Sequence, residues 1–395
     1  MKITRVEPIL LRGDQQYQDT ASGAEAVDNG DWQLLVRVET DEGLEGWSDA
    51  ETLAPAAVAI IAGQGMGTLG FRTLADLLIG EDPLDIERLW DKLYVGSAYY
   101  GRRGIAVQCM SAIDLCLWSI RAQAANMSIA QLLGGRRHDR VTAYASTLFR
   151  STPEGMAEAA RGYMDKGFRA VKFGWGVFGQ DKGRDRELVA AAREALGPDR
   201  HLLVDPGWYP AGWTEPGPSR NRREAIELTE WLADYNVGWC EDFIHPERFE
   251  EYAEVRALSP TPIAAGEQLA TIWEFERFIG MGCVDYIHPD LTRCGGLTVA
   301  HRVAEMATKA NIELVPHSWL THLLTGYSLQ LIATLPRAPF LEFNVSQSAL
   351  TGGIATAPFK LDEDGMVAIP TGVGTGVDVN RDFIAAHRVE TGSVL

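Results

Sequence analysis

The sequence is poor in cysteine and contains neither a long hydrophobic run nor the pattern of a cleaved leader. Its five cysteines are an odd number and include no Cys-x-x-Cys pair. They predict reduced, mostly buried thiols in a cytoplasmic protein, and they make a zinc site unexpected. The longest near-apolar run, residues 54–63, is about half of the roughly 20 residues that a membrane-spanning helix needs. The first seven residues alternate like a β-strand and lack the apolar core of a signal peptide, so we expect no membrane partner.

Basic residues are also in deficit. The chain has 36 Lys and Arg against 54 Asp and Glu, a net charge of −18, which argues against a nucleic-acid partner. The overall field would not attract an anionic substrate, which would need a bound cation or a local cluster of Lys and Arg. At 395 residues the chain is long enough for two domains, or for one large barrel with an attachment.

The first third of the chain predicts an α+β unit. Residues 2–11, 32–40 and 44–48 alternate like antiparallel strands, and residues 54–134 change to a helical period. The polar stretch 12–31 between the first two strands is either disordered or a functional lid. Asp114 falls within the apolar stripe of a predicted helix at 104–125. A buried carboxylate bonded to a neighbouring helix is the favoured interpretation there, and a catalytic role is the alternative.

From residue 141 onward, short apolar runs alternate with helical segments. Eight runs separated by helices predict a parallel (β/α) barrel of the α/β class, with its reactive groups at the carboxyl ends of the strands. The runs lie at 141–146, 170–173, 202–205, 237–241, 263–267, 286–288, 313–315 and 341–343. The segment 206–221 is rich in Gly, Pro and Trp, including Trp208 and Trp213, and predicts an ordered loop over the barrel mouth.

Three acidic residues end consecutive predicted strands: Asp205, Glu241 and Glu267. Converging carboxylates repel one another and raise one another's pKa unless a cation lies between them. Mg²⁺ accepts carboxylate oxygens and keeps positions open for substrate oxygens, whereas an all-oxygen set disfavours zinc. The alternative is that each acid is a helix N-cap or a solvated strand end, which is less plausible for three successive strands.

Other strand ends carry further reactive groups. Asp290 and His317 end neighbouring strands, and an aspartate beside an imidazole fixes its tautomer and raises its basicity, as a general base requires. Lys172 ends the second strand and could supply positive charge or accept a proton, or it could simply reach solvent. Glu342 ends the last strand, where it could hydrogen-bond to a substrate carboxylate oxygen. His245 and His288 are weaker candidates, with a pocket-lining role favoured for both.

These residues and the order of the domains resemble the enolase superfamily, and within it the mandelate racemase subgroup. The resemblance covers nearly the whole chain, and its most specific segments are 204–205 (VD), 240–242 (CED), 266–267 (GE), 289–296 (PDLTRCGG), 316–318 (PHS) and 342–344 (EFN). It implies a modified (β/α)7β TIM-type barrel with an α+β capping domain. The implied domains are the cap at 1–135 with a specificity loop near 12–31, the barrel at 136–352, and a segment at 353–395 that returns to the cap.

The resemblance also implies roles for single residues. One Mg²⁺ per subunit would be held by Asp205, Glu241 and Glu267. The His317–Asp290 dyad would be the general acid and base, and Glu342 would help to stabilise an enolate. It further implies a homo-oligomer and a small carboxylate substrate.

One departure from the family pattern bears on the reaction. The second strand of the barrel often carries Lys-x-Lys, and here Gly174 follows Lys172 in place of the second lysine. A racemase needs a base on each face of the stereocentre, so this change weakens a racemase interpretation. We therefore expect a dehydratase of a sugar acid that gives a 2-keto-3-deoxy acid. The alternatives are a racemase or epimerase with Lys172 as the second base, and a non-catalytic scaffold or binding protein.

Overall fold

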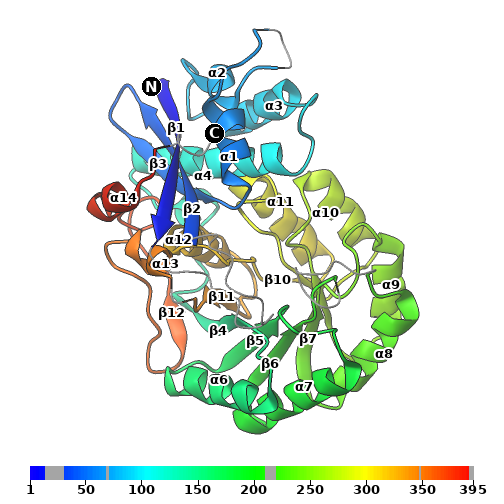
Figure 1. Cartoon of the computed structure of the whole chain (residues 1–395). Coiled ribbons are helices and arrows are strands. Elements are labelled where there is room, and N and C mark those ends of the chain that lie inside the picture. Colours follow the sequence, from blue (N-terminus) through cyan, green and yellow to red (C-terminus); the bar gives the residue numbers. More distant parts are fainter. Residues whose placement is uncertain (14–30, 68–70, 210–218, 347, 391–395) are drawn as a thin grey trace.

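The computed structural model describes residues 1–13, 31–67, 71–209, 219–346 and 348–390. A three-stranded antiparallel sheet and several helices form a cap over one end of a barrel (Figure 1). The strands of the cap are β1 (Ile3–Gly13), β2 (Asp31–Thr40) and β3 (Glu45–Ala50). Its helices are α1 (Ala54–Ala62), α2 (Leu74–Leu78), α3 (Ile86–Gly96), α4 (Ile105–Ala124) and α5 (Ile129–Leu132). Most of the predicted loop 12–31 and part of the loop 206–221, including Trp213, lie outside the described residues.

Helix α4 is the central helix of the cap. Its length and composition would allow it to span a membrane, but 72% of its most apolar window is buried inside the protein. It packs on β2 and β3 on one side and on α11 of the barrel on the other. A helix that is apolar almost all round is typical of a core helix with neighbours on several faces.

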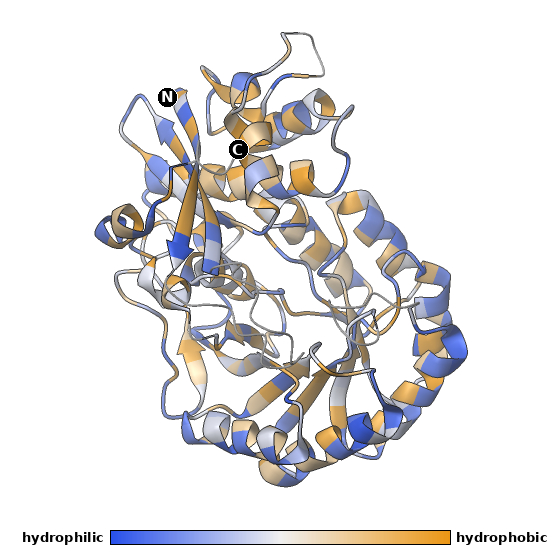
Figure 2. Ribbon diagram, viewed as in Figure 1, coloured by the Kyte–Doolittle hydropathy of each residue, from blue (hydrophilic) through white to orange (hydrophobic). Residues whose placement is uncertain are grey.

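Eight parallel strands form the barrel in the spatial order β10-β9-β8-β7-β6-β5-β4-β11, which confirms the predicted fold class. They are β4 (Arg140–Leu148), β5 (Ala170–Gly174), β6 (His201–Asp205), β7 (Val237–Glu241), β8 (Ile263–Ala265), β9 (Tyr286–Ile287), β10 (Glu313–Leu314) and β11 (Leu341–Asn344). The helices outside them are α6 (Pro153–Asp165), α7 (Lys182–Leu196), α8 (Arg222–Ala233), α9 (Phe249–Leu258), α10 (Thr271–Gly280), α11 (Gly296–Lys309) and α12 (His322–Ile332). Blue and orange segments alternate along this outer ring, as expected of amphipathic helices (Figure 2).

The side chains inside the barrel form two layers, an apolar layer and a charged layer. The charged layer lies at the end of the barrel nearer the cap, which is called the mouth below. Tyr144, Ala170, Leu203 and Trp239 belong to one buried cluster inside the barrel. Inward-pointing residues recur every second position along a strand. The charged residues two positions beyond Ala170, Leu203 and Trp239 therefore point inward as well, one layer nearer the cap. They are Lys172, Asp205 and Glu241.

Buried carboxylates of the cap bind the N-termini of two barrel helices. Asp114 on α4 accepts hydrogen bonds from the backbone N–H of Thr298 (3.0 Å) and from its hydroxyl (2.5 Å) in the first turn of α11. This confirms the prediction of a carboxylate bonded to a neighbouring helix. Asp49 on β3 accepts in the same way from Thr321 and from the backbone N–H of Leu324, at the start of α12. Both contacts give acceptors to backbone N–H groups that the first turn of a helix leaves without an intrahelical partner.

The last segment of the chain contacts both parts of the molecule. It contains α13 (Ala349–Gly353), β12 (Met366–Ala368) and α14 (Arg381–His387). Strand β12 pairs antiparallel with β4 of the barrel, whereas Arg388 bridges to Leu11 of β1 and Ile384 packs in the apolar cluster of Ile9 and Leu11. Figure 1 shows α14 beside the cap sheet. The exact domain boundaries at 135 and 352 stay a prediction.

Candidate active site

Lys172 lies at the centre of the charged mouth. Its Nζ is 2.9 Å from Glu241 Oε1 and 2.9 Å from Glu342 Oε1, and 3.9 Å from Asp205 Oδ2. Burial alone would lower the pKa of Lys172, but Glu241 and Glu342 outweigh it and hold this pKa well above its ordinary value. The structure thus brings one predicted cation together with three of the predicted acids, and the lysine does not reach solvent.

The predicted dyad is formed. His317 Nδ1 is 2.5 Å from Asp290 Oδ2, and the two residues form a parallel bridge that extends the pairing of β9 and β10. The other oxygen of Asp290 accepts hydrogen bonds from the backbone N–H and the hydroxyl of Thr292, both at 2.6 Å. Burial opposes ionisation of Asp290, but the hydrogen bond from His317 lowers the pKa of this carboxyl to about 2. The carboxylate is therefore held charged against the imidazole.

The second nitrogen of His317 faces other carboxylates. Its Nε2 is 3.0 Å from Glu267 Oε2 and 3.9 Å from Glu342 Oε2. Burial lowers the pKa of His317, and Glu267, Glu342 and Asp290 together raise it well above the ordinary value. Glu342 is fixed by the hydroxyl of Ser146 and the backbone N–H of Ser318, each at 2.7 Å. It thus lies between Lys172 and His317 and links the two sides of the mouth.

The acids at the ends of β6, β7 and β8 fit a hard divalent cation. Burial, and after it the charge of Glu241, raises the pKa of Asp205 well above its ordinary value. Burial and the charge of Glu267 do the same for Asp242, whose Oδ2 is buried without a hydrogen-bond partner. Four buried carboxylates gather here: Asp205, Glu241, Asp242 and Glu267. Such a surplus of negative charge and oxygen donors fits Mg²⁺.

The three predicted ligands are not gathered as tightly as a single coordination sphere. Among the described residues, the group whose potential ligand atoms all lie within 4.8 Å of one another is Glu51, Asp290 and His317. Glu241 instead accepts from Lys172, from the indole N–H of Trp239 at 2.9 Å, and contacts His288 Nδ1 at 3.2 Å. Glu267 turns to His317 and to an arginine. The assignment of these three acids as magnesium ligands stays a prediction.

Two residues of the mouth were not predicted from the sequence. Arg293, in the loop between β9 and α11, binds Glu267 Oε1 through Nη1 at 3.2 Å and forms an ion pair with Glu51 through Nη2. Arg293 is part of the segment 289–296, so its position in that motif was the available signal. Glu51 follows β3 in the cap, and no sequence signal connects it with the barrel. His288 was predicted to line a pocket, and it lies against Glu241 and the Trp239 ring.

No second base faces the dyad at the end of β5. A Cβ placed on Gly174 would lie 3.2 Å from Cβ and from Oδ2 of Asp205, which is tighter than ordinary packing. The glycine therefore allows close approach of the Asp205 side chain. Lys172, the remaining lysine of this strand, is already bound by two carboxylates.

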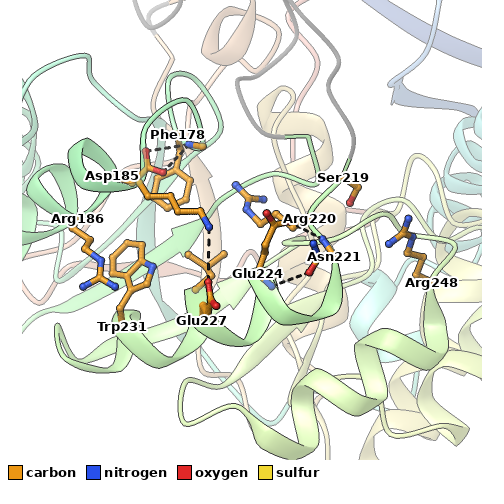
Figure 3. Close-up of a pocket in the computed structure, with 13 residues that line it drawn as sticks. Phe178, Asp185, Arg186, Ser219, Arg220, Asn221, Glu224, Glu227, Trp231 and Arg248 are labelled. Carbon is orange, nitrogen blue, oxygen red and sulfur yellow. Dashed lines mark hydrogen bonds and ion pairs between the residues drawn. The ribbon is translucent and has the colours of Figure 1, made fainter.

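The structure has one hollow next to the mouth and another on the outer side of the barrel. One, of about 320 Å³, lies between β2 of the cap and the ends of β10 and β11; its lining includes Trp32, Gln33, Trp319, Asn344 and Thr351. The other, of about 580 Å³, lies between α7 and α8, outside the barrel (Figure 3). In that pocket Arg186 stacks on Trp231 and Asn221 caps α8, and none of the predicted site residues lines it. His245 packs against Trp208.

Comparisons with known proteins give consistent matches. The sequence profile described as "Enolase C-terminal domain-like" matches residues 155–383. The profile described as "Mandelate racemase / muconate lactonizing enzyme, N-terminal domain" matches residues 26–134.

Single relatives match over almost the whole chain. D-Galactarolactone cycloisomerase from Agrobacterium fabrum is 32% identical over 98% of this chain and 99% of its own. D-Gluconate dehydratase from Thermoproteus tenax is 28% identical over 99% of this chain and 75% of its own. The crystal structure of 3,6-anhydro-D-galactonate cycloisomerase from Zobellia galactanivorans has a TM-score of 0.84 and 28% identity, and covers 99% of this chain and 100% of that one.

Proposed function

The chain belongs to the enolase superfamily, in its mandelate racemase and muconate lactonizing enzyme group, and we propose that it is a Mg²⁺-dependent dehydratase of a sugar acid. Its relatives include dehydratases and cycloisomerases of sugar acids, which makes it an enzyme in the range of lyases and isomerases. Enolase-superfamily sites use a Lys or His base with one or two Mg²⁺ ions. Bound Mg²⁺ would neutralise the substrate carboxylate and so acidify the proton on the α-carbon.

The observation that carries the proposal is the dyad on one side of the mouth, opposite a lysine that two carboxylates already bind. In its neutral form His317, oriented by Asp290, takes the α-proton and becomes an imidazolium; the carboxylates that raise the pKa of His317 in the free site stabilise this charged form. The C–O bond at the β-carbon then breaks, and the same imidazolium returns the proton to the departing oxygen, which leaves as water. The resulting enol tautomerises to a 2-keto-3-deoxy acid. Lys172 supplies positive charge next to the developing enolate, and Glu342 holds the Lys172 ammonium in that position.

The surroundings of the dyad support a substrate rich in hydroxyl groups. Trp319 follows His317 by two residues and Asn344 follows Glu342 by two, so the hollow of about 320 Å³ adjoins the mouth. Indole rings and amide side chains together suit a sugar, whose C–H groups pack on rings while its hydroxyls need hydrogen-bond partners. Of the ten buried side-chain atoms that have no hydrogen-bond partner among the described residues, five belong to residues at or beside the mouth, as is expected where a polar ligand binds. These five atoms belong to Glu51, Tyr144, Asp242, His288 and Ser318.

A cycloisomerase is the second candidate. It would use the same proton abstraction at His317, but a ring oxygen of a lactone or anhydro sugar would leave in place of hydroxide. The relatives from Agrobacterium fabrum and Zobellia galactanivorans, which match this chain over nearly its full length, favour this alternative. A racemase or epimerase is supported less, because Gly174 removes one base and Glu241 and Glu342 bind Lys172. We also propose a cytoplasmic homo-oligomer with one Mg²⁺ per subunit.

The test is a screen of aldonic acids, aldaric acids, their lactones and anhydro acids with MgCl₂, in which 2-keto acids and ring-opened products are detected separately. Formation of a 2-keto acid from an open-chain acid, with a need for Mg²⁺ and loss in His317→Asn, supports the dehydratase. Consumption of a lactone or anhydro acid alone supports the cycloisomerase. Exchange of the α-proton in D₂O without either product supports the epimerase. No turnover and no exchange would favour the non-catalytic alternative.

A further inference from the structure

Glu51 brings a carboxylate from the cap into the mouth of the barrel. It directly follows the last residue of β3, and its side chain is only 21% exposed. Its Oε1 forms an ion pair with Nη2 of Arg293, and the same guanidinium binds Glu267. The side chain of Arg293 is itself 16% exposed, so this chain of three charged groups runs through the protein interior. Arg293 therefore fixes the Glu51 side chain in place through Oε1, one of the two carboxylate oxygens of Glu51.

The other oxygen of Glu51 takes no part in this ion pair. Oε2 is buried and has no hydrogen-bond partner among the described residues. Buried polar atoms in native proteins nearly always have a partner, and a charged acceptor loses more than a neutral one when it is left without a donor. Asp290 cannot donate a hydrogen bond to Glu51 Oε2, because both oxygens of the Asp290 carboxylate are themselves acceptors.

Glu51 also lies next to the dyad. One potential ligand atom from each of Glu51, Asp290 and His317 lies within 4.8 Å of the others. A substrate that loses a proton to His317 must place its α-carbon at hydrogen-bond distance from the imidazole. Groups on the neighbouring carbons of that substrate then come within reach of Glu51.

We propose that Glu51 determines specificity by accepting a hydrogen bond, through Oε2, from a hydroxyl group of the sugar acid close to the carbon that reacts at His317. The inference rests on the proposed function, since it presupposes a polyhydroxy acid bound at the dyad. The chemistry of a carboxylate acceptor decides which kind of substrate group Glu51 can recognise. A carboxylate gains a charge-assisted hydrogen bond from a hydroxyl, gains nothing from a methylene and repels a second carboxylate.

The experiment compares each acid that the wild-type enzyme consumes with analogues that lack one hydroxyl at a position the reaction does not change. We expect one analogue to lose about ten- to 100-fold in kcat/KM in the wild-type enzyme, as for a hydrogen bond to a charged group. In Glu51→Leu the same pair of substrates should differ by less than about threefold, because the acceptor is gone. Glu51→Gln keeps a polar group there and should give an intermediate ratio.

Glu81→Leu is the matched control, because Glu81 is also a glutamate of the cap that pairs with basic residues, Arg88 and Lys92, outside the mouth. It should leave the substrate ratio unchanged. Thermal unfolding of every variant checks folding, and the wild-type and Glu51→Gln data suffice if Glu51→Leu does not fold. A hydroxyl preference that survives in Glu51→Leu, or no hydroxyl preference in an active wild-type enzyme, overturns the inference and leaves the proposed function standing. A wild-type enzyme that consumes no acid overturns both.

A measurement of metal binding tests whether Glu51 instead helps to hold a cation. If Glu51, Asp290 and His317 together held a cation, calorimetric titration with MgCl₂ would count one more ion per chain in the wild-type protein than in Glu51→Leu. We expect the two counts to be equal, since Glu51 is assigned to the substrate.

Discussion

His317 Nδ1 lies 2.5 Å from Asp290 Oδ2, and no other carboxylate among the described residues binds this nitrogen. The contact joins the ends of two neighbouring strands, β9 and β10. It fixes the imidazole so that Nε2, and not Nδ1, faces the mouth. The geometry of the candidate reaction depends on this one pair.

Replacing either member of the pair should abolish turnover without unfolding the protein. We expect His317→Asn to lower kcat by about 10²- to 10⁴-fold, the range that a positioned general base contributes. Asp290→Asn should also lower kcat, because it removes the charge that holds the imidazole in one tautomer. Steady-state assays of 2-keto acid formation measure both effects. A variant that keeps both its thermal unfolding temperature and a near wild-type kcat would rule out the assigned role.

Removal of a predicted metal ligand should have opposite effects with and without the ion. Asp205 is buried beside Glu241, and its pKa is raised well above the ordinary value by burial and by that charge. In EDTA, Asp205→Asn should therefore unfold at the same temperature as the wild type or a higher one. The rise in unfolding temperature that Mg²⁺ gives the wild type through binding to the folded state should be smaller or absent in the variant. A full Mg²⁺ response in Asp205→Asn would contradict the ligand assignment.

Loss of the central lysine should destabilise the fold. Lys172→Met leaves Glu241 and Glu342 as buried charges without their shared partner, which costs on the order of 3–5 kcal/mol. Urea unfolding in EDTA gives the free energy of unfolding. The double variant Lys172→Met/Glu342→Gln should recover part of this loss, since residues in one charged network are coupled by about 0.5–3 kcal/mol. Strict additivity of the two changes would show that the ion pair is not important for stability.

The Asp114 contact predicts a pH dependence of stability. Burial raises the pKa of Asp114 from 3.8 to about 7, although hydrogen bonds from Thr298 and the charge of Arg302 act in the opposite direction. The unfolded chain releases this proton near pH 4 and the folded protein only near pH 7. The contribution of Asp114 to the free energy of unfolding is therefore largest below about pH 4, falls by on the order of 4 kcal/mol as the pH rises to about 7, and is then constant.

The measurement is urea unfolding of the wild type and of Asp114→Asn between pH 5 and 8. The difference between the two proteins should change over this range, in favour of the variant at the higher pH, because asparagine does not ionise. Asp139→Asn is the control, since the Asp139 side chain is 97% exposed and should give a constant difference. A constant difference for Asp114→Asn as well would show that Asp114 ionises in the folded protein at its ordinary pKa.

The sequence by itself determined the barrel and most of the residues at its mouth. Each of the eight runs of apolar residues became a strand, because period-two burial and the intervening helical segments are local properties of the chain. Asp205 and Glu241 end their strands, Asp290 and His317 lie three residues beyond β9 and β10, and Glu342 lies within β11. The carboxyl ends of parallel strands meet at one face, so the meeting of these side chains could be predicted from strand ends alone.

Only the tertiary structure decided how these side chains pair. The sequence allowed Lys172 to reach solvent or to act as a base, and the structure places it between Glu241 and Glu342. Glu51 reaches the dyad because the cap docks on the barrel through Asp114 and Asp49, and residues 51 and 317 are far apart in the chain. Periodicity and strand ends report on neighbours along one element, whereas a contact between two separately folded units depends on how their surfaces fit.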